Sequence, residues 1–314
     1  MTGCGPQSLT PVKEKKCQKE KMMLLQIECI PCMLNMAASM IRLLDLDESH
    51  AKKLFAEILQ TPGLRGDIYD ITSPDVIESV MTKIIRASGV PDPFCSAKRK
   101  QNEIALGLYP SLRSLVEASP TPLHTATKLA ILGNAIDFMV PHSTEQIERF
   151  IRGNLESPLP EKEYETFRNR LAGSDLVLFF GDNSGEIVLD RLLMETIQKT
   201  HNPDIVYVVR SIPAMNDSTI AEAQFTEMGR TARVLENGIQ GPFPGNRIRR
   251  CSTEVRKLIR NADMIVSKGG GNFDSLDEEK EDLKGRITFL LLSKCAPYHR
   301  RFGVPPFEPI IANF

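Results

Sequence analysis

The stretch Leu176–Phe180, with the sequence LVLFF, runs directly into Gly181–Glu186, with the sequence GDNSGE. A continuous apolar run bounded by glycine is typical of a strand buried on both faces, and such strands belong to parallel sheets covered by helices. In these sheets, ligands bind outside the carboxyl ends of the strands. We therefore expect Asp182 and Asn183 to face a crevice, where their oxygen atoms would suit a hard divalent cation. The alternative is a glycine-flanked turn in which the acid only caps the backbone.

A second predicted strand, Asp204–Val209, ends in the same kind of loop. The loop Arg210–Asp217 again places an amide beside an acid, Asn216 and Asp217. Because neighbouring parallel strands end at the same edge of a sheet, we expect these groups to lie near the first pair. Arg210 would hold a phosphate there, or would only pair with a local carboxylate.

A third predicted strand, Met264–Ser267, opens into the glycine-rich loop Lys268–Asp274, with the sequence KGGGNFD. Consecutive glycines remove the side chains that would keep backbone N–H groups away from an anion, and a lysine supplies positive charge. The substrate-binding residues expected in this loop are Lys268, Gly269, Gly270, Gly271 and Asn272.

The composition of the chain limits its function classes. Of the 314 residues, 41% are hydrophobic, which is enough for a substantial core in one large or two ordinary domains. The formal net charge of -1 provides no field for nonspecific binding to nucleic acid or to an anionic membrane. We find neither a membrane-spanning apolar run nor a secretory signal, so we expect a cytoplasmic protein without nucleic-acid or membrane partners.

The seven cysteines are odd in number and dispersed, which indicates mostly free thiols. Cys29 and Cys32 are the exception, because their CxxC spacing can bind a soft metal or form a redox pair. A complete zinc site would need Cys95, Cys251 or Cys295 to be brought in by folding. A structural or incidental role for the pair is the other interpretation.

The chain is predicted to be α/β, with a helical region before a mainly parallel sheet. Residues 1–21 are charged and poor in apolar side chains, which predicts a mobile arm. Residues 22–157 predict an all-α region, and residues 158–314 alternate strands with helices, which is typical of a parallel sheet flanked by helices. The helices are expected at 29–44, 47–59, 74–87 after a Ser73 cap, 97–106, 112–117, 122–140, 145–154, 161–171, 186–199, 219–228 and 253–261. The strands are expected at 175–180, 205–209, 233–235, 264–267 and 287–292.

Two groups of polar residues stand out in the predicted helical region. Asn134 and Asp137 lie three positions apart on an apolar helix, so they share one face and need a partner, either in the core or around an active site. Asp92, Lys98 and Asn102 form a similar series, whose role the spacing does not decide.

These motifs together resemble the damage-control phosphatase family, long catalogued as domain of unknown function 89, and in particular its short stand-alone branch with a CxxC pair. The matching segments are Glu28–Cys32, Asp92–Phe94 with Lys98 and Asn102, Gly133–Phe138, Gly181–Val188, Arg210–Asp217 and Lys268–Asp274. The resemblance implies a Rossmann-like three-layer α/β domain after a helical region, and divalent-metal-dependent hydrolysis of phosphomonoesters. The substrate would be a small phosphorylated metabolite, such as a sugar phosphate or a damaged or intermediate cofactor phosphate.

The resemblance also implies roles for single residues. The family holds one metal ion, for which we expect Mn, Co, Ni or Mg, by an adjacent acid and amide and an acid from the following strand end. These ligands match Asp182, Asn183 and Asp217, and the phosphate-facing lysine matches Lys268. The chain departs from its relatives at three positions: relatives often have Gln at Gly270, Glu at Asp274 and Gln at Met36.

We therefore expect phosphoryl transfer to water, with Lys268 and Arg210 holding the phosphate oxygens beside the metal ion. The nucleophile is either Asp182 or a water molecule on the metal. Glu186 supports the site, or only opens the following helix, where the helix dipole favours an acid.

Two other function classes fit the same pattern less well. A methyltransferase or another nucleotide-cofactor enzyme also uses glycine-rich loops, but Gly269–Gly271 lack the spaced glycines of a dinucleotide fingerprint. A non-enzymatic metal-binding scaffold would use the CxxC pair for assembly. The sequence predicts no oligomeric state.

Overall fold

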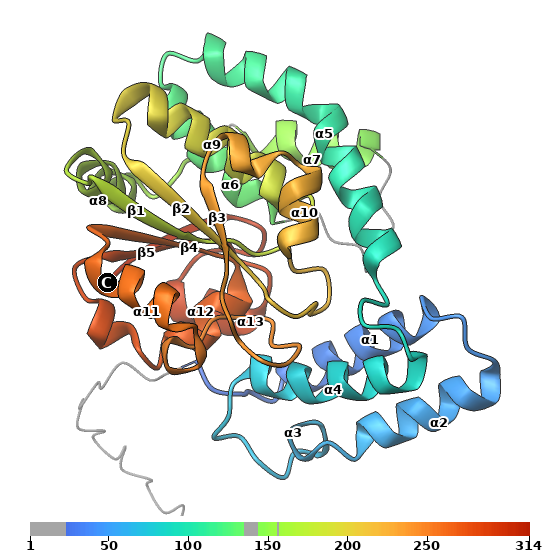
Figure 1. The fold of residues 1–314 in the computed structure, drawn as a ribbon. Coiled ribbons are helices and arrows are strands. Elements are labelled where there is room, and N and C mark those ends of the chain that lie inside the picture. Colours follow the sequence, from blue (N-terminus) through green and yellow to red (C-terminus); the bar gives the residue numbers. More distant parts are fainter. Residues whose placement is uncertain (1–22, 135–143, 156) are drawn as a thin grey trace, which may run out of the picture.

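The computed structural model describes residues 23–134, 144–155 and 157–314, and its centre is a six-stranded sheet in the order β3-β2-β1-β4-β5-β6 (Figure 1). The strands are β1 (Leu176–Phe180), β2 (Asp204–Val209), β3 (Arg233–Glu236), β4 (Met264–Lys268), β5 (Ile287–Leu292) and β6 (Pro309–Asn313). Neighbouring strands are parallel from β3 to β5, and β6 pairs antiparallel with β5. The predicted sheet is thus confirmed, with β6 as an addition.

The described helices surround this sheet. They are α1 (Cys29–Arg42), α2 (Glu48–Leu59), α3 (Pro62–Arg65), α4 (Ser73–Ser88), α5 (Cys95–Ala118), α6 (Pro122–Gly133), α7 (Thr144–Asn154), α8 (Glu161–Ala172), α9 (Glu186–Thr200), α10 (Ile220–Phe225), α11 (Thr253–Asn261), α12 (Gly270–Leu276) and α13 (Ala296–Phe302), with short 3-10 turns η1 (Met228–Arg230), η2 (Ile248–Arg250) and η3 (Lys280–Leu283). None of the described helices has the length and apolar character that crossing a membrane requires.

The alternation of side chains along each strand divides the sheet between two apolar cores. On β1, Val177 and Phe179 belong to a core shared with α5, α6, α8 and α9, whereas Leu178 and Phe180 belong to a core shared with α11, α12 and α13. Because both faces are covered by helices, the strands read as continuous apolar runs. This packing confirms the three-layer α/β architecture.

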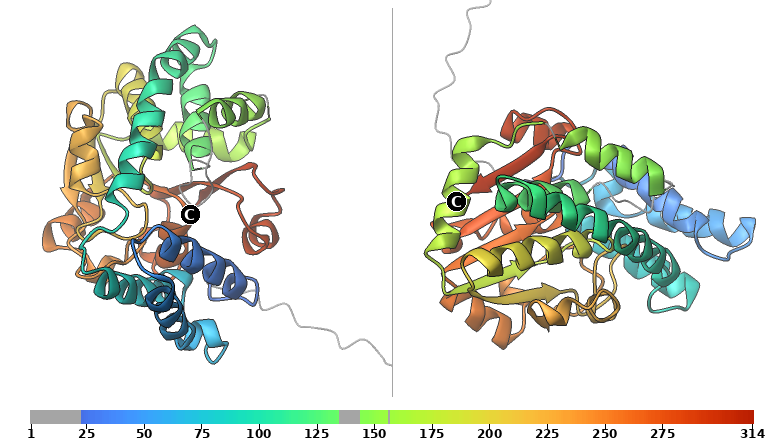
Figure 2. Two further views of the ribbon diagram at one scale, coloured as in Figure 1. Left: turned by 90° about the vertical axis from the view of Figure 1, so that its right-hand side faces the viewer. Right: turned by 90° about the horizontal axis from the view of Figure 1, so that it is seen from above.

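The helices before the sheet fall into two groups. Helices α1 to α4 enclose a core of their own, which includes Met40, Ile58 and Val80, and Figures 1 and 2 show them grouped beyond one end of the sheet. Helices α5 and α6 instead contribute Leu112 and Leu129 to the core of the sheet. The predicted division at residue 157 stays a prediction, and the predicted arm lies outside the described residues.

Helix α5 corrects the prediction of two separate helices at 97–106 and 112–117. It runs unbroken from Cys95 to Ala118 with Pro110 inside it. Proline removes one backbone hydrogen bond, but Leu108, Leu112 and Val116 lie on one face of the helix and are buried in the core that α5 shares with α6 and α9. Tertiary packing therefore outweighs the local cost of the proline.

Three smaller expectations also change. The predicted helix at 219–228 is the short α10 followed by η1, because Glu227 has a left-handed φ of 54°. The N-cap of α4 is Thr72 instead of Ser73, and Thr72 forms a capping box with Asp75. Helix α6 ends at Gly133, and most of the remainder of the predicted 122–140 helix lies outside the described residues.

The order of the strands fixes the position of a crevice. From β1 the chain first builds β2 and β3 on one side, and it then crosses to build β4 and β5 on the other side. The carboxyl ends of β1 and β4 therefore lie at the point where the winding direction reverses, which is where ligands bind in sheets of this kind.

Candidate functional site

A cavity of about 400 Å³ lies at the carboxyl ends of β1, β4 and β5, facing α1 and α4. Its volume is in the range of small-molecule sites. Its lining includes six of the residues that the sequence assigned to the site, which are Asp182, Asn183, Asn216, Asp217, Gly270 and Gly271. The remaining predicted residues, Glu186, Arg210, Lys268, Gly269 and Asn272, do not line it.

The backbone joins the loops after β1 and β2. The Ser218 amide donates to the Asp182 carbonyl at 2.7 Å, and the Ser184 amide donates to the Asn216 carbonyl at 2.8 Å. The backbones of Asn183 and Asp217 form an isolated antiparallel β-bridge between these two hydrogen bonds. The two predicted acid and amide pairs are therefore held side by side.

Arg210 lies between the two acids of the site. Its Nε donates to Asp217 Oδ2 at 2.6 Å, and its Nη2 donates to Asp182 Oδ1 at 3.4 Å. The guanidinium is almost completely buried, and its Nη1 has no hydrogen-bond partner among the described residues. Arg210 thus pairs with local carboxylates, as one of the two interpretations expected, and ties the ends of β1 and β2 together.

Asn134 and Glu186 form the support behind Asp182. Asn134 Nδ2 donates to Asp182 Oδ2 at 3.1 Å and to Glu186 Oε2 at 2.7 Å. Asn183 Nδ2 donates to the same two carboxylate oxygens, at 2.8 and 3.1 Å. Both amides thereby fix the orientation of Asp182. Asp137 lies outside the described residues.

Lys268 differs from the expectation of a phosphate-facing lysine. Its Nζ donates to Glu186 Oε1 at 2.6 Å, to Asp190 Oδ1 at 2.5 Å and to the Ala130 carbonyl at 2.9 Å. These acceptors use all three of its N–H bonds, and the side chain is completely buried. In this structure Lys268 orients Glu186, and it does not reach the cavity.

The glycine-rich loop allows a close approach between β1 and β4. Gly269 has a φ of +73°, and a Cβ atom there would lie 1.7 Å from Asp182 Oδ2, so no other residue fits. Asn272 Nδ2 donates to the Gly181 carbonyl at 2.9 Å and to the Lys268 carbonyl at 2.7 Å. Gly269 and Asn272 therefore serve the geometry around Asp182.

The buried charges of this region are unbalanced. Four carboxylates, those of Asp182, Glu186, Asp190 and Asp217, face the two cations Arg210 and Lys268. Burial, followed by the charges of Asp217 and Glu186, raises the pKa of Asp182 well above its usual value, and burial also raises the pKa of Asp217. Burial raises the pKa of Asp190 to about 6.

The excess of buried carboxylates fits the oxygen ligands that a divalent cation would need at the cavity. Asp182 and Asp217 offer carboxylate oxygens and Asn183 an amide oxygen, which are the ligands of hard divalent cations. Among the described residues, no group of three or more His, Cys, Asp and Glu side chains could hold a metal ion. The expected set contains only two residues of those types, because its third ligand is an amide.

Sequence comparison identifies the family of the chain. The profile of the damage-control phosphatase ARMT1-like domain matches residues 25–309. The chain belongs to this family. The resemblance inferred from the six motifs is thereby confirmed.

Similar archaeal proteins cover most of the chain. An uncharacterized protein of Methanocaldococcus jannaschii is 30% identical over 88% of this chain and 91% of its own length. A damage-control phosphatase of Pyrococcus horikoshii is 27% identical over 90% of this chain and 96% of its own length, and one of Archaeoglobus fulgidus is 32% identical over 71% and 76%. The crystal structure of the P. horikoshii protein, of the domain of unknown function 89 family, superposes with a TM-score of 0.79 at 24% identity over 93% of this chain and 99% of that chain, which shows the same fold.

The polar residues Asp92, Lys98 and Asn102, which belong to one of the family motifs, lie next to the loop after β1 and to α10. Lys98 is completely buried and forms ion pairs with Asp92 at 2.6 Å and with Glu222 at 3.1 Å. Asn102 accepts a hydrogen bond from the Gly185 amide at 2.6 Å. Asn102 therefore holds the loop after β1 from the side of α5, and Lys98 joins α5 to α10.

The sequence-based site did not include two polar residues that line the cavity, Lys294 and Asp274. Lys294 follows β5, is exposed, and lines the cavity. Asp274 accepts hydrogen bonds from Ser73 at 2.5 Å and from Tyr298 at 2.9 Å. The position of Lys294 just after a buried strand is the same signal that identified Asp182, whereas the partners of Asp274 are distant in sequence.

The CxxC pair lies at the start of α1 and also lines the cavity. Cys29 is half-buried with a free thiol, and Cys32 is exposed. Burial raises the pKa of Cys29, so its thiol is less readily ionised than an exposed one. A metal-binding or redox role of the pair stays a prediction.

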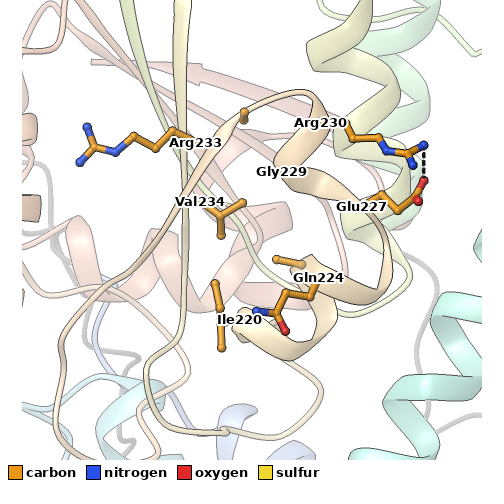
Figure 3. Close-up of a pocket in the computed structure, with 9 residues that line it drawn as sticks. Ile220, Gln224, Glu227, Gly229, Arg230, Arg233 and Val234 are labelled. Atoms are coloured by element: carbon orange, nitrogen blue, oxygen red, sulfur yellow. Dashed lines mark ion pairs between the residues drawn. The ribbon is translucent and has the colours of Figure 1, made fainter.

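A second pocket lies between α10, η1 and the edge strand β3 (Figure 3). Its charged side chains are already paired, because Glu227 binds Arg230 at 2.9 Å and Arg233 binds Glu254. The remaining labelled side chains, such as Ile220 and Val234, offer no acid, base or nucleophile. This pocket therefore lacks the converging groups of an active site.

Proposed function

We propose that this chain is a divalent-metal-dependent phosphatase that hydrolyses small phosphorylated metabolites. The observation that supports the proposal is the convergence of Asp182, Asn183 and Asp217 at one end of the cavity, with Arg210 joined to both acids. Membership of a phosphatase family and two archaeal relatives named as damage-control phosphatases support the same activity.

The proposed metal ligands are Asp182, Asn183 and Asp217. Two carboxylates and an amide oxygen favour Mn, Co, Ni or Mg over a thiolate-seeking ion. The surplus of buried negative charge around Asp182 also favours a divalent cation. When bound, such an ion would polarise a phosphoryl oxygen and offset the charge of the phosphate.

The chain itself would hold the phosphate through three groups of the lining. Lys294 would attract the dianion, and Asn216 and the backbone of Gly270–Gly271 also line the cavity and can donate hydrogen bonds. Arg210 and Lys268 act from behind, since their hydrogen bonds orient Asp182, Asp217 and Glu186. The site therefore supplies position and charge, which are the main demands of phosphoryl transfer.

The test is phosphate release from a panel of sugar phosphates and an aryl phosphate, with Mn, Co, Ni and Mg supplied separately. We expect metal-dependent release that Asp182→Ala abolishes. Asp204→Asn is the matched control, because this exposed acid lies at the opposite end of β2. Methyl transfer without phosphate release would favour the methyltransferase alternative, and the absence of both activities would favour a non-enzymatic scaffold.

A further inference from the structure

The two ends of the cavity differ in chemistry. One part of the lining carries the acids and amides of the loops after β1 and β2, and the apolar wall is formed mainly by side chains of α1 and α4, completed by Met215 and Leu292. On the basis of the proposed phosphatase activity, we infer that the alcohol released from the phosphate is apolar: an aliphatic, aromatic or thioether-bearing group instead of a sugar.

The apolar wall comes from four separate elements. Met33 and Met36 lie on α1, Ile77 lies on α4, and Met215 and Leu292 come from the loop after β2 and the end of β5. Met33, Met36, Ile77 and Leu292 are also buried in the cores behind the wall. A leaving group bound here would therefore meet apolar atoms across most of its surface.

Three polar side chains near this wall already have hydrogen-bond partners. The hydroxyls of Ser73 and Tyr298 both donate to Asp274, and Glu28 accepts from Arg300 at 2.7 Å. A sugar placed against this wall would exchange its hydrogen bonds to water for few hydrogen bonds to protein. Burying unpaired hydroxyl groups is unfavourable, so this wall selects against polyols.

The methionines suit an adaptable apolar surface. Unbranched thioether side chains can fill irregular space around ligands of different shape. Met215 has a left-handed φ of 50°, which is costly for a residue with a side chain, and it packs against the core of α1 to α4. The strained backbone of Met215 thus places its thioether in the wall, directly before Asn216 and Asp217.

A matched pair of substrates tests the inference. Cyclohexylmethyl phosphate and glucose 6-phosphate both carry the phosphate on a CH₂ group beside a six-membered ring, but only the second has ring hydroxyls. In both reactions water adds to phosphorus as the P–O bond to the alcohol breaks, and the alcohol leaves with a proton. We expect kcat/KM to favour the cyclohexyl compound by about tenfold or more.

Met36→Gln should lower this preference by about tenfold, mainly through a higher KM for the cyclohexyl compound, because it places an amide of similar size in the wall. Leu43→Gln introduces the same amide at the exposed C-cap of α1, outside the cavity, and should leave the ratio unchanged. Thermal unfolding of both variants would show whether the fold is retained.

Binding is measured separately from turnover with the two phosphonates in which a CH₂ group replaces the ester oxygen, by calorimetry on the full chain. Tighter binding of the cyclohexyl phosphonate supports the apolar wall even if no phosphate is released. Phosphate release with a preference for glucose 6-phosphate, or tighter binding of the sugar phosphonate, would overturn the inference and leave the phosphatase proposal standing. Failure to hydrolyse any phosphomonoester would instead overturn the proposed function.

Discussion

The two walls of the cavity are held in place by different forces. At the strand ends, Asp182 receives hydrogen bonds from Asn134, Asn183 and Arg210. On the opposite wall, Met36 is positioned only by packing within the core of α1 to α4. Directional bonds fix a charged group to a fraction of an ångström, whereas apolar packing tolerates other side chains of similar volume.

This difference suggests a division of labour between the two regions. The sheet supplies the groups that would act on a phosphate, and the separate helical cluster supplies the surface for the rest of the substrate. Changes in the first wall should therefore remove activity for all substrates, and changes in the second should redistribute activity among substrates. Four substitutions examine this comparison.

Asp217→Asn is expected to have the largest effect. It keeps the size of the side chain but removes one of the two proposed carboxylate ligands and the charge that pairs with Arg210 at 2.6 Å. We expect kcat/KM to fall about a thousandfold for apolar and sugar phosphates alike. A loss confined to one class of substrate would contradict the separation of the two walls.

Lys268→Met should act chiefly on stability. It leaves Glu186 and Asp190 buried without their cation, which we expect to lower the free energy of unfolding by about 3–5 kcal/mol in urea titrations. The double variant Lys268→Met with Asp190→Asn should recover part of this loss, because one buried charge disappears. Unchanged stability together with a raised KM would show that Lys268 contacts the substrate instead.

Asp274 should make stability depend on pH. Burial raises its pKa from 3.8 to about 7, so between these values the native state keeps a proton that the unfolded chain has released. The free energy of unfolding should therefore fall as the pH rises from about 4 to about 7 and then level off. Other buried acids add to the same trend, so the measurement is the difference between the wild type and Asp274→Asn.

The substituted side chain cannot lose a proton, and the Asp274→Asn curve should fall less steeply over that range. Asp282→Asn, which changes an exposed acid, is the control and should follow the wild type. Parallel curves for all three proteins would mean that Asp274 is ionised in the native state throughout.

Lys294→Met is expected to have the smallest effect. The exposed amine would contribute attraction to the phosphate without supporting the fold, so we expect KM to rise about tenfold and stability to change by less than about 0.5 kcal/mol. The wild-type KM should also rise with salt, and that of the variant should rise less. Lys284→Met, at an exposed position on η3's C-cap, serves as the control.

The sequence could predict the first wall because its signals are local. Each buried strand appears in the sequence as an apolar run, and the residues that follow it must lie at the carboxyl edge of the sheet. This reasoning predicted the positions of Asp182 and Asp217. The same logic misplaced Lys268, the last residue of β4, whose side chain turns towards α9 instead of the cavity. Strand position alone did not decide on which side of the sheet that lysine lies.

The second wall could not be predicted in this way. Met33 and Met36 recur at helical spacing, which is the usual pattern of a core, and both are indeed buried. Met36 also lines a cavity because α1 to α4 pack against the strand ends. No local sequence pattern predicts that packing. The continuous helix α5 has the same cause, because its packing on α6 and α9 overrides Pro110.

The neighbouring position of β1 and β4 has a consequence for the nascent protein. All three proposed metal ligands precede β3 in the chain, but Gly269, which leaves room for the Asp182 carboxylate, arrives only with β4. A truncated chain could thus contain the proposed metal ligands and still lack the geometry that places the Asp182 carboxylate. Turnover would begin only once synthesis has delivered the far half of the sheet, so incomplete chains in a cell would stay catalytically silent.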